Sequence, residues 1–161
     1  MDAVYTYINV LRDTLQKKKN VLEQIFVASE QQKVVLQQDE FEEEGFVQTI
    51  SVKEKLLKDL EKLDQGFEQI YERVSLAIKH NKDTYKNELL AIQKLIQQII
   101  DLSMSIRALE EQNKNRFQIC LTQKKANIRN FKVSSRAVTN YYKSMPNIHQ
   151  DGQSYFMDKK K

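Results

Sequence analysis

The chain of 161 residues is poor in the residues that end or bend helices, since it contains 3 Gly and 1 Pro. Neither residue occurs anywhere in the 79 residues from Phe67 to Met145. Runs of β-branched and aromatic residues in period-two alternation, which are typical of strands, are missing as well, whereas Leu, Ile, Gln, Glu and Lys are abundant. The sequence therefore predicts an all-α fold.

The sequence is equally poor in residues that carry catalysis or bind metals. A single cysteine, Cys120, excludes an intramolecular disulfide and a Cys-rich metal site. The two histidines, His80 and His149, have no further ligand at suitable spacing, and no Gly-rich phosphate loop, HExxH or CxxC motif is present. We expect no enzyme activity, no metal and no cofactor, and we expect Cys120 to be a small buried hydrophobe.

Long apolar runs are also lacking. No stretch approaches the roughly 20 apolar residues that a bilayer requires, and nothing near the N-terminus combines a basic region with an apolar signal core. We therefore expect a cytoplasmic protein without membrane insertion.

The charges that are present divide unevenly along the chain. Residues 30–72 hold 12 acidic and 5 basic side chains, whereas residues 112–161 hold 11 basic and 2 acidic ones. No base-reading or RNA-binding motif accompanies the basic half, so we expect no nucleic-acid binding. Attraction between antiparallel neighbours across solvated faces is the simpler interpretation of this asymmetry.

Apolar residues recur at alternate steps of four and three, the pattern of helices that pack in a bundle or coiled coil. The pattern predicts helices at about 2–37, 39–79 and 84–143, in an elongated antiparallel three-helix bundle with a long third helix. Met145 and Pro146 end the third helix, and residues 144–161 are expected to form a flexible tail.

Local signals refine the first two helices. The stripe of the first helix has polar interruptions at Lys18, Ser29 and Gln32. Asp39 is the expected cap of the second helix, with Glu42 completing a capping box. Gly66 lies within the second helix at a cost near ~1 kcal/mol relative to Ala, which indicates either a close helix approach or local weakness.

The third helix is longer than its predicted partners. From Tyr85 to Tyr142 it would extend roughly 85 Å, whereas two helices of about 35 residues would extend roughly 50 Å. Its apolar stripe shifts at Asn113, where two successive steps of four insert a stutter. We therefore expect the part beyond Asn113 to be uncovered and to bind a partner. The predicted contact residues are Phe117, Leu121, Ile128, Phe131, Val138 and Tyr142.

Two other arrangements of the same region stay open. The polar stretch 112–115 is able to form a turn, which would fold residues 116–143 back as a fourth helix. Alternatively, two copies of the chain pair through the uncovered stripe, so that the protein is a structural coiled-coil scaffold.

The order of these features resembles that of FlgN-type flagellar export chaperones, over residues 1 to about 143. A long first helix, a break with an acidic turn, a charged second helix and a third helix with a Leu/Asn-containing segment follow one another. The segments that carry the resemblance are Gln38–Glu42 (QDEFE), Val52–Leu60 (VKEKLLKDL), Ile106–Asn113 (IRALEEQN) and the terminal Tyr155–Lys161 (YFMDKKK).

The resemblance implies a cytosolic chaperone, a monomer or weak homodimer. Such a chaperone binds the C-terminal helical segments of the hook-filament junction proteins FlgK and FlgL and delivers them to the export-gate protein FlhA. In that family the C-terminal region of the long helix holds the client, which corresponds here to Phe117–Tyr142. Gate docking in the family involves the C-terminal region and a tyrosine, so the resemblance makes Tyr141, Tyr155 and Phe156 candidates for this contact.

Overall fold

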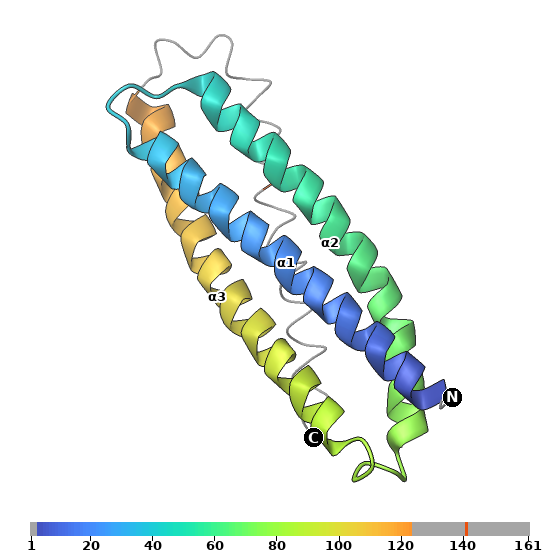
Figure 1. Ribbon diagram of the computed structural model, residues 1–161. Helices are drawn as coiled ribbons and strands as arrows, with labels where there is room; N and C mark the ends of the chain where they lie inside the picture. Colours follow the sequence, from blue (N-terminus) through green and yellow to red (C-terminus); the bar gives the residue numbers. More distant parts are fainter. Residues whose placement is uncertain (1–2, 124–140, 142–161) are drawn as a thin grey trace.

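The structure, a computed structural model, describes residues 3–123 and Tyr141. Its three helices are α1 (Ala3–Gln37), α2 (Glu43–Ile78) and α3 (Lys86–Gln123). They run antiparallel in an up-down-up bundle (Figure 1). At 35, 36 and 38 residues they have nearly equal lengths, each roughly 55 Å. The predicted all-α, three-helix architecture is confirmed.

The core of the bundle is built on the stripe that the sequence predicts for α1. Of the ten positions at alternate steps of four and three from Val4 to Leu36, nine are buried, including the three polar interruptions Lys18, Ser29 and Gln32. The side chain of Lys18 is paired with Asp64 of α2 at 2.6 Å. The polar interruptions are therefore internal contacts between helices and not breaks in the packing.

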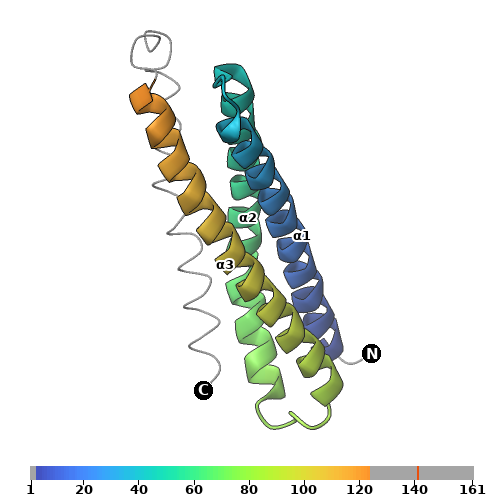
Figure 2. The same cartoon turned by 90° about the vertical axis from the view of Figure 1, so that its left-hand side faces the viewer.

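The helix α1 lies between the other two. Both α2 and α3 pack along its length, but no Cα atom of α2 comes within 8 Å of one in α3. Figure 1 shows α1 in front of and between its neighbours, and Figure 2 shows α3 crossing at an angle to α1 and α2. Long side chains make the contacts between α2 and α3, as in the stacked rings of Phe46 and Phe117, whose centroids are 4.8 Å apart.

The second helix begins differently from the prediction. Its N-cap is Glu42, in an extended conformation and without a side-chain capping bond, and α2 starts at Glu43. The predicted capping box at Asp39 is therefore wrong. Aromatic packing holds this connection instead, because the ring of Phe41 lies 5.4 Å from that of Phe46 and 6.4 Å from that of Phe117.

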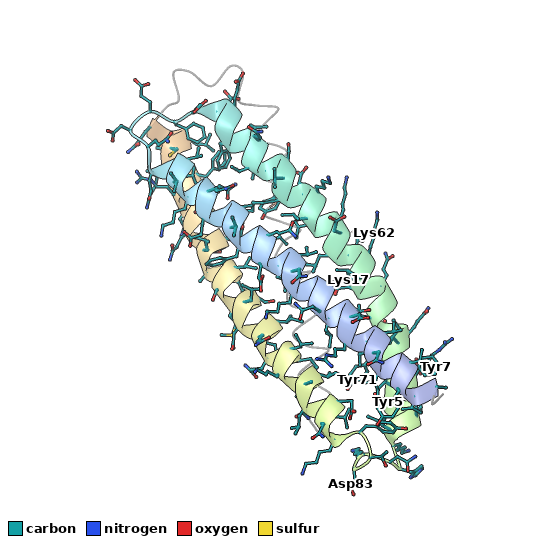
Figure 3. The ribbon with its side chains drawn as sticks, in the orientation of Figure 1. Tyr5, Tyr7, Lys17, Lys62, Tyr71 and Asp83 are labelled. Atoms are coloured by element: carbon teal, nitrogen blue, oxygen red, sulfur yellow. The ribbon has the colours of Figure 1, made fainter. Side chains whose placement is uncertain are left out.

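Aromatic residues also gather at the opposite end of the bundle. Tyr5 and Tyr7 near the start of α1 lie at the same end as Tyr71 of α2 and the turn that contains Asp83 (Figure 3). The rings of Tyr5 and Tyr85 meet edge-on at 5.0 Å. These contacts close the end where α2 turns into α3, whereas Lys17 and Lys62 lie further along α1 and α2.

The third helix is covered further than the sequence predicts. Residues beyond Asn113 still pack against α1, and the Phe117 side chain is only 4% exposed. The expectation that coverage ends at Asn113 is therefore wrong for the described part, because the rings of Phe41 and Phe46 pack on Phe117. Cys120 is buried as predicted, and its Sγ lies 3.8 Å from the carbonyl oxygen of Leu36. The predicted helix over 124–140 and the predicted tail lie outside the described residues.

By length and composition, α3 is also the one helix in the described ranges that is apolar enough to cross a membrane. No membrane-spanning segment was expected, because the sequence holds no long unbroken run of apolar residues. The apolar residues of α3 are instead spread over several faces of one helix. A core helix of a bundle has the same composition, and Ile92, Ile99 and Ile106 are buried in the bundle core.

The environment of Gly66 leads to a stability prediction. A Cβ atom added there would meet nothing within 4 Å, so this glycine weakens α2 locally and allows no close helix approach. Gly66→Ala should raise the free energy of unfolding by about 0.5–1 kcal/mol, measured by urea denaturation, because Ala costs less backbone entropy in a helix. The neighbouring Gln65→Ala is the control, with a change under about 0.5 kcal/mol. A loss of stability in Gly66→Ala would contradict the prediction.

A buried polar layer and a candidate partner-binding seam

Five polar side chains form a layer in the half of the bundle nearer the connection between α1 and α2, in a core that is otherwise mainly apolar. Lys53 of α2 is fully buried, and Glu110 of α3 is 5% exposed. Ser29 and Gln32 of α1 and Asn113 of α3 are buried beside them. We call these five residues the polar layer.

The polar layer joins all three helices. The Lys53 ammonium is paired with the Glu110 carboxylate and donates to Gln32 Oε1 at 2.9 Å. Ser29 Oγ donates to Glu110 Oε1 at 2.6 Å. Asn113 Nδ2 lies 3.0 Å from the Ser29 carbonyl oxygen and 3.2 Å from Gln32 Oε1. The residue that marks the stutter in the sequence is thus a donor within the core.

The network extends one step further into α2. Gln32 Nε2 donates to Thr49 Oγ1 at 3.0 Å, and Thr49 Oγ1 donates to the Phe46 carbonyl oxygen at 2.6 Å. Glu110 Oε2 is buried and has no hydrogen-bond partner within the described part of the chain. The glutamate therefore relies on Lys53 and Ser29 to offset the loss of its hydration.

Two opposing electrostatic effects in the polar layer act on the pKa of Lys53. Burial lowers the pKa of this side chain from 10.5 to about 8, because removal from water disfavours the ammonium form. The Glu110 carboxylate and its hydrogen bond act in the opposite direction, and they leave most of the lysine protonated at pH 7. The layer thus holds a charged pair at neutral pH.

A third contact to Lys53 comes from far along the chain. The centroid of the Tyr141 ring lies 4.6 Å from Lys53 Nζ. Tyr141 is only 2% exposed. The other contacts of the ammonium group come from Gln32 of α1 and Glu110 of α3, so Tyr141 adds a contact from a separate part of the chain. A helix that continued straight from Glu110 would have carried Tyr141 roughly 46 Å away.

The facing stripes of α2 and α3 meet at this layer. Ile50, Lys53 and Leu57 share one face of α2 through steps of three and four, and Ile96, Ser103 and Glu110 recur every seven residues on α3. We call these six residues the α2–α3 seam. Its apolar members flank the ion pair on both sides, an arrangement suited to an amphipathic helix.

A separate pocket of about 390 Å³ opens beside the polar layer. Helices α1 and α3 supply its walls, and Asn113 contributes to both the pocket and the layer. Arg116 Nε, at the pocket edge, donates to the Leu36 carbonyl oxygen at 3.2 Å. The other lining residues are Lys33, Gln37 and Gln112.

The predicted client-contact residues and the gate-docking candidates separate into three groups. Phe117 is stacked on Phe46 in the core, which corrects its placement on an uncovered surface. Leu121 is partly buried against the core, and Tyr141 is buried beside Lys53. The remaining residues lie outside the described part of the chain, namely Ile128, Phe131, Val138, Tyr142, Tyr155 and Phe156.

The sequence predictions missed Lys53 and Glu110. A signal was available, because Phe46, Ile50, Lys53, Leu57 and Leu60 follow one another at steps of four and three and place a charge among buried positions. Glu110 follows Leu109, and nothing in its local sequence distinguishes it from the adjacent Glu111. Within residues 3–123, no group of three acidic, His or Cys side chains is placed to hold a metal ion.

Comparison with known proteins adds no relative. No protein-family model, no curated protein and no solved structure matches the chain. The functional argument therefore depends on the residues and their geometry.

The ion pair predicts a strongly non-additive pair of substitutions. Lys53→Met leaves a buried carboxylate without its cation and should lower the free energy of unfolding by about 3–5 kcal/mol. Adding Glu110→Leu to it should restore much of that loss, because two apolar groups remove both charges. Guanidinium denaturation of the two single variants and the double variant measures the coupling. Additive losses would mean that the two side chains act independently.

The lowered pKa of Lys53 predicts a dependence of stability on pH. Between about 8 and 10.5 the unfolded chain binds more protons at Lys53 than the folded one, so stability should rise with pH across this range. The gain should approach about 3 kcal/mol, and it should be lost as the pH falls through 8. The measurement is the unfolding free energy of the natural chain relative to Lys53→Met at each pH, since other titrating groups cancel. A constant difference from pH 7 to 10.5 would contradict the assignment.

Proposed function

We propose that the chain is an export chaperone of the FlgN type, a cytoplasmic protein that binds the C-terminal helical segments of FlgK and FlgL and delivers them to FlhA. The observation that supports this proposal is the separation between the backbones of α2 and α3. Helices α2 and α3 both pack on α1, whereas they meet each other only through side chains and without a close backbone approach, as two diagonal helices do in a four-helix bundle. A client helix is the natural fourth member.

The α2–α3 seam has the chemistry that such a client requires. Ile50 and Leu57 lie on either side of Lys53 on α2 and are buried, while Ile96 of α3 is partly buried, so a client helix would have to open the seam to bind them. An amphipathic helix binds such a surface through apolar residues at intervals of three and four. The proposal thus places the client against described residues of α2 and α3, in addition to the stripe that ends at Tyr142.

Charge supports a protein client over nucleic acid. Acidic side chains dominate residues 30–72, which include most of α2, and basic ones dominate residues 112–161. A helix bound along the seam would face both signs of charge, which favours an amphipathic peptide with mixed charges over a uniformly anionic polymer.

The test is binding of purified C-terminal segments of FlgK and FlgL, measured by calorimetry. Ile96→Asp places a charge in the seam and should weaken binding at least about tenfold, which corresponds to about 1.4 kcal/mol. Met104→Asp is the matched control, because Met104 lies on the same helix but is 59% exposed. Circular dichroism should show that both variants stay helical. Equal binding by both variants would overturn the placement of the client.

The scaffold alternative gives a different result in light scattering. A chaperone should be a monomer or a dimer that dissociates on dilution, and the added client segment should form a complex with it. A dimer that persists at every concentration and binds neither client segment would contradict the chaperone proposal. It would favour a scaffold that self-associates through the long helix.

A further inference from the structure

We propose that the pocket between α1 and α3 binds the free carboxylate at the C-terminal end of a peptide chain. The pocket has a volume of about 390 Å³ and lies where the end of α1 packs beside α3. This volume is within the range of about 300–1,000 Å³ that is usual for ligand pockets. The proposal stands on the residues of the pocket and does not depend on the proposed function, whose client contacts lie on the α2–α3 seam.

Two cationic side chains line the pocket without a carboxylate partner. They are Lys33 of α1 and Arg116 of α3. Within the described part of the chain neither of them forms an ion pair, whereas the buried Lys18 and Lys53 each have one. Among the described residues, no acidic side chain lines the pocket. The lining is therefore positively charged and attracts an anion.

The guanidinium group of Arg116 is already held in place. Its Nε donates to the Leu36 carbonyl oxygen at 3.2 Å, close to the end of α1 at Gln37. This bond uses one of the five N–H donors of the side chain. The terminal nitrogens Nη1 and Nη2 form no hydrogen bond with the described residues. They offer a planar pair of donors that matches the two oxygens of a carboxylate.

A buried amide supplies an acceptor in the same pocket. Asn113 is 1% exposed and uses its Nδ2 for Ser29 and Gln32, so Oδ1 is the polar side-chain atom that it has left for the pocket. An acceptor repels a second anionic oxygen and suits an N–H group. The last residue of a peptide carries a carboxylate and a backbone N–H on the same Cα atom. It therefore provides both groups that the pocket is able to bind.

The charge of the pocket suits a carboxylate better than a phosphate. Helix α1 ends beside the pocket, and the last carbonyl groups of a helix carry a partial negative charge. Lys33 and Arg116 are able to offset one negative charge against these carbonyl groups, whereas a phosphate monoester brings about 1.5–2 charges at pH 7. Leu36 is the apolar member of the described lining, which suits an aliphatic last residue.

Four probes distinguish these ligands. They are acetyl-Gly-Leu with a free carboxylate, the same peptide with a C-terminal amide, acetate and inorganic phosphate. Binding is followed by NMR through the side-chain amide signals of Asn113 and Gln112 and the Nε–H signal of Arg116. The free-acid peptide should shift these signals in a saturable manner, and the amidated peptide should bind at least about tenfold more weakly, because it lacks the charge.

Each other result of this titration overturns a stated part of the proposal. Without a saturable shift by the free-acid peptide, the pocket is no carboxylate site. Acetate that binds as tightly as the peptide would show that a free small carboxylate is sufficient, which would overturn the assignment to a chain end. Tighter binding of phosphate would overturn the choice of a carboxylate.

Matched variants test whether the peptide binds in this pocket. Gln112→Glu places a carboxylate in the lining and should weaken binding at least about tenfold by repulsion. Gln118→Glu is the control, because Gln118 is also exposed on α3 but does not line the pocket. Circular dichroism should show that both variants stay helical. Equal binding by the two variants would place the peptide elsewhere and overturn the proposal.

A second pair of variants removes a cation from α1. Lys33→Gln should raise the dissociation constant of the free-acid peptide by roughly fivefold, whereas Lys17→Gln should leave it unchanged. Lys17 is exposed on the same helix and lies outside the pocket lining. An unchanged dissociation constant in Lys33→Gln would overturn the role of this lysine in binding the carboxylate.

Discussion

The ion pair between Lys53 and Glu110 is the interaction on which the arrangement of the bundle depends. Helices α2 and α3 have no close backbone approach, so long side chains hold them at a defined distance from each other. Burial of these charges is costly, and the pair is tolerated because Ser29, Gln32 and Tyr141 surround it. Sliding either helix by one turn would separate the charges within the core. We therefore regard the polar layer as the element that sets the register of the three helices, and the coupled variants of Lys53 and Glu110 test this role.

The central position of α1 follows from its sequence and has consequences for function. Its stripe is wide enough to serve two neighbours, because Lys18 contacts α2 while Ser29 contacts α3. Consequently, α1 alone does not cover every side of α2 and α3. A chaperone for helical segments requires such a side, and it also requires that the side be covered when no client is present.

Much of the fold was predictable because helical periodicity is a local property. The stripe of α1, the three-helix order and the burial of Cys120 all follow from spacing along the chain. The start of α2 was not predictable from Asp39, because the packing of Phe41 against Phe46 and Phe117 outweighs a capping box. The coverage of Phe117 was also missed, since helix length alone does not say where the neighbouring helix ends.

The sequence by itself determined the all-α class, the approximate limits of the first two helices and the polar interruptions of the α1 stripe, because each depends on residues within a few turns of one another. Only the tertiary structure decided which polar residues meet. Lys53 and Glu110 are 57 residues apart in the chain, and Tyr141 follows Glu110 by a further 31. Their meeting depends on the antiparallel alignment of helices, which side-chain packing over the whole bundle sets and no local pattern encodes. The candidate partner site is therefore a property of the assembled bundle.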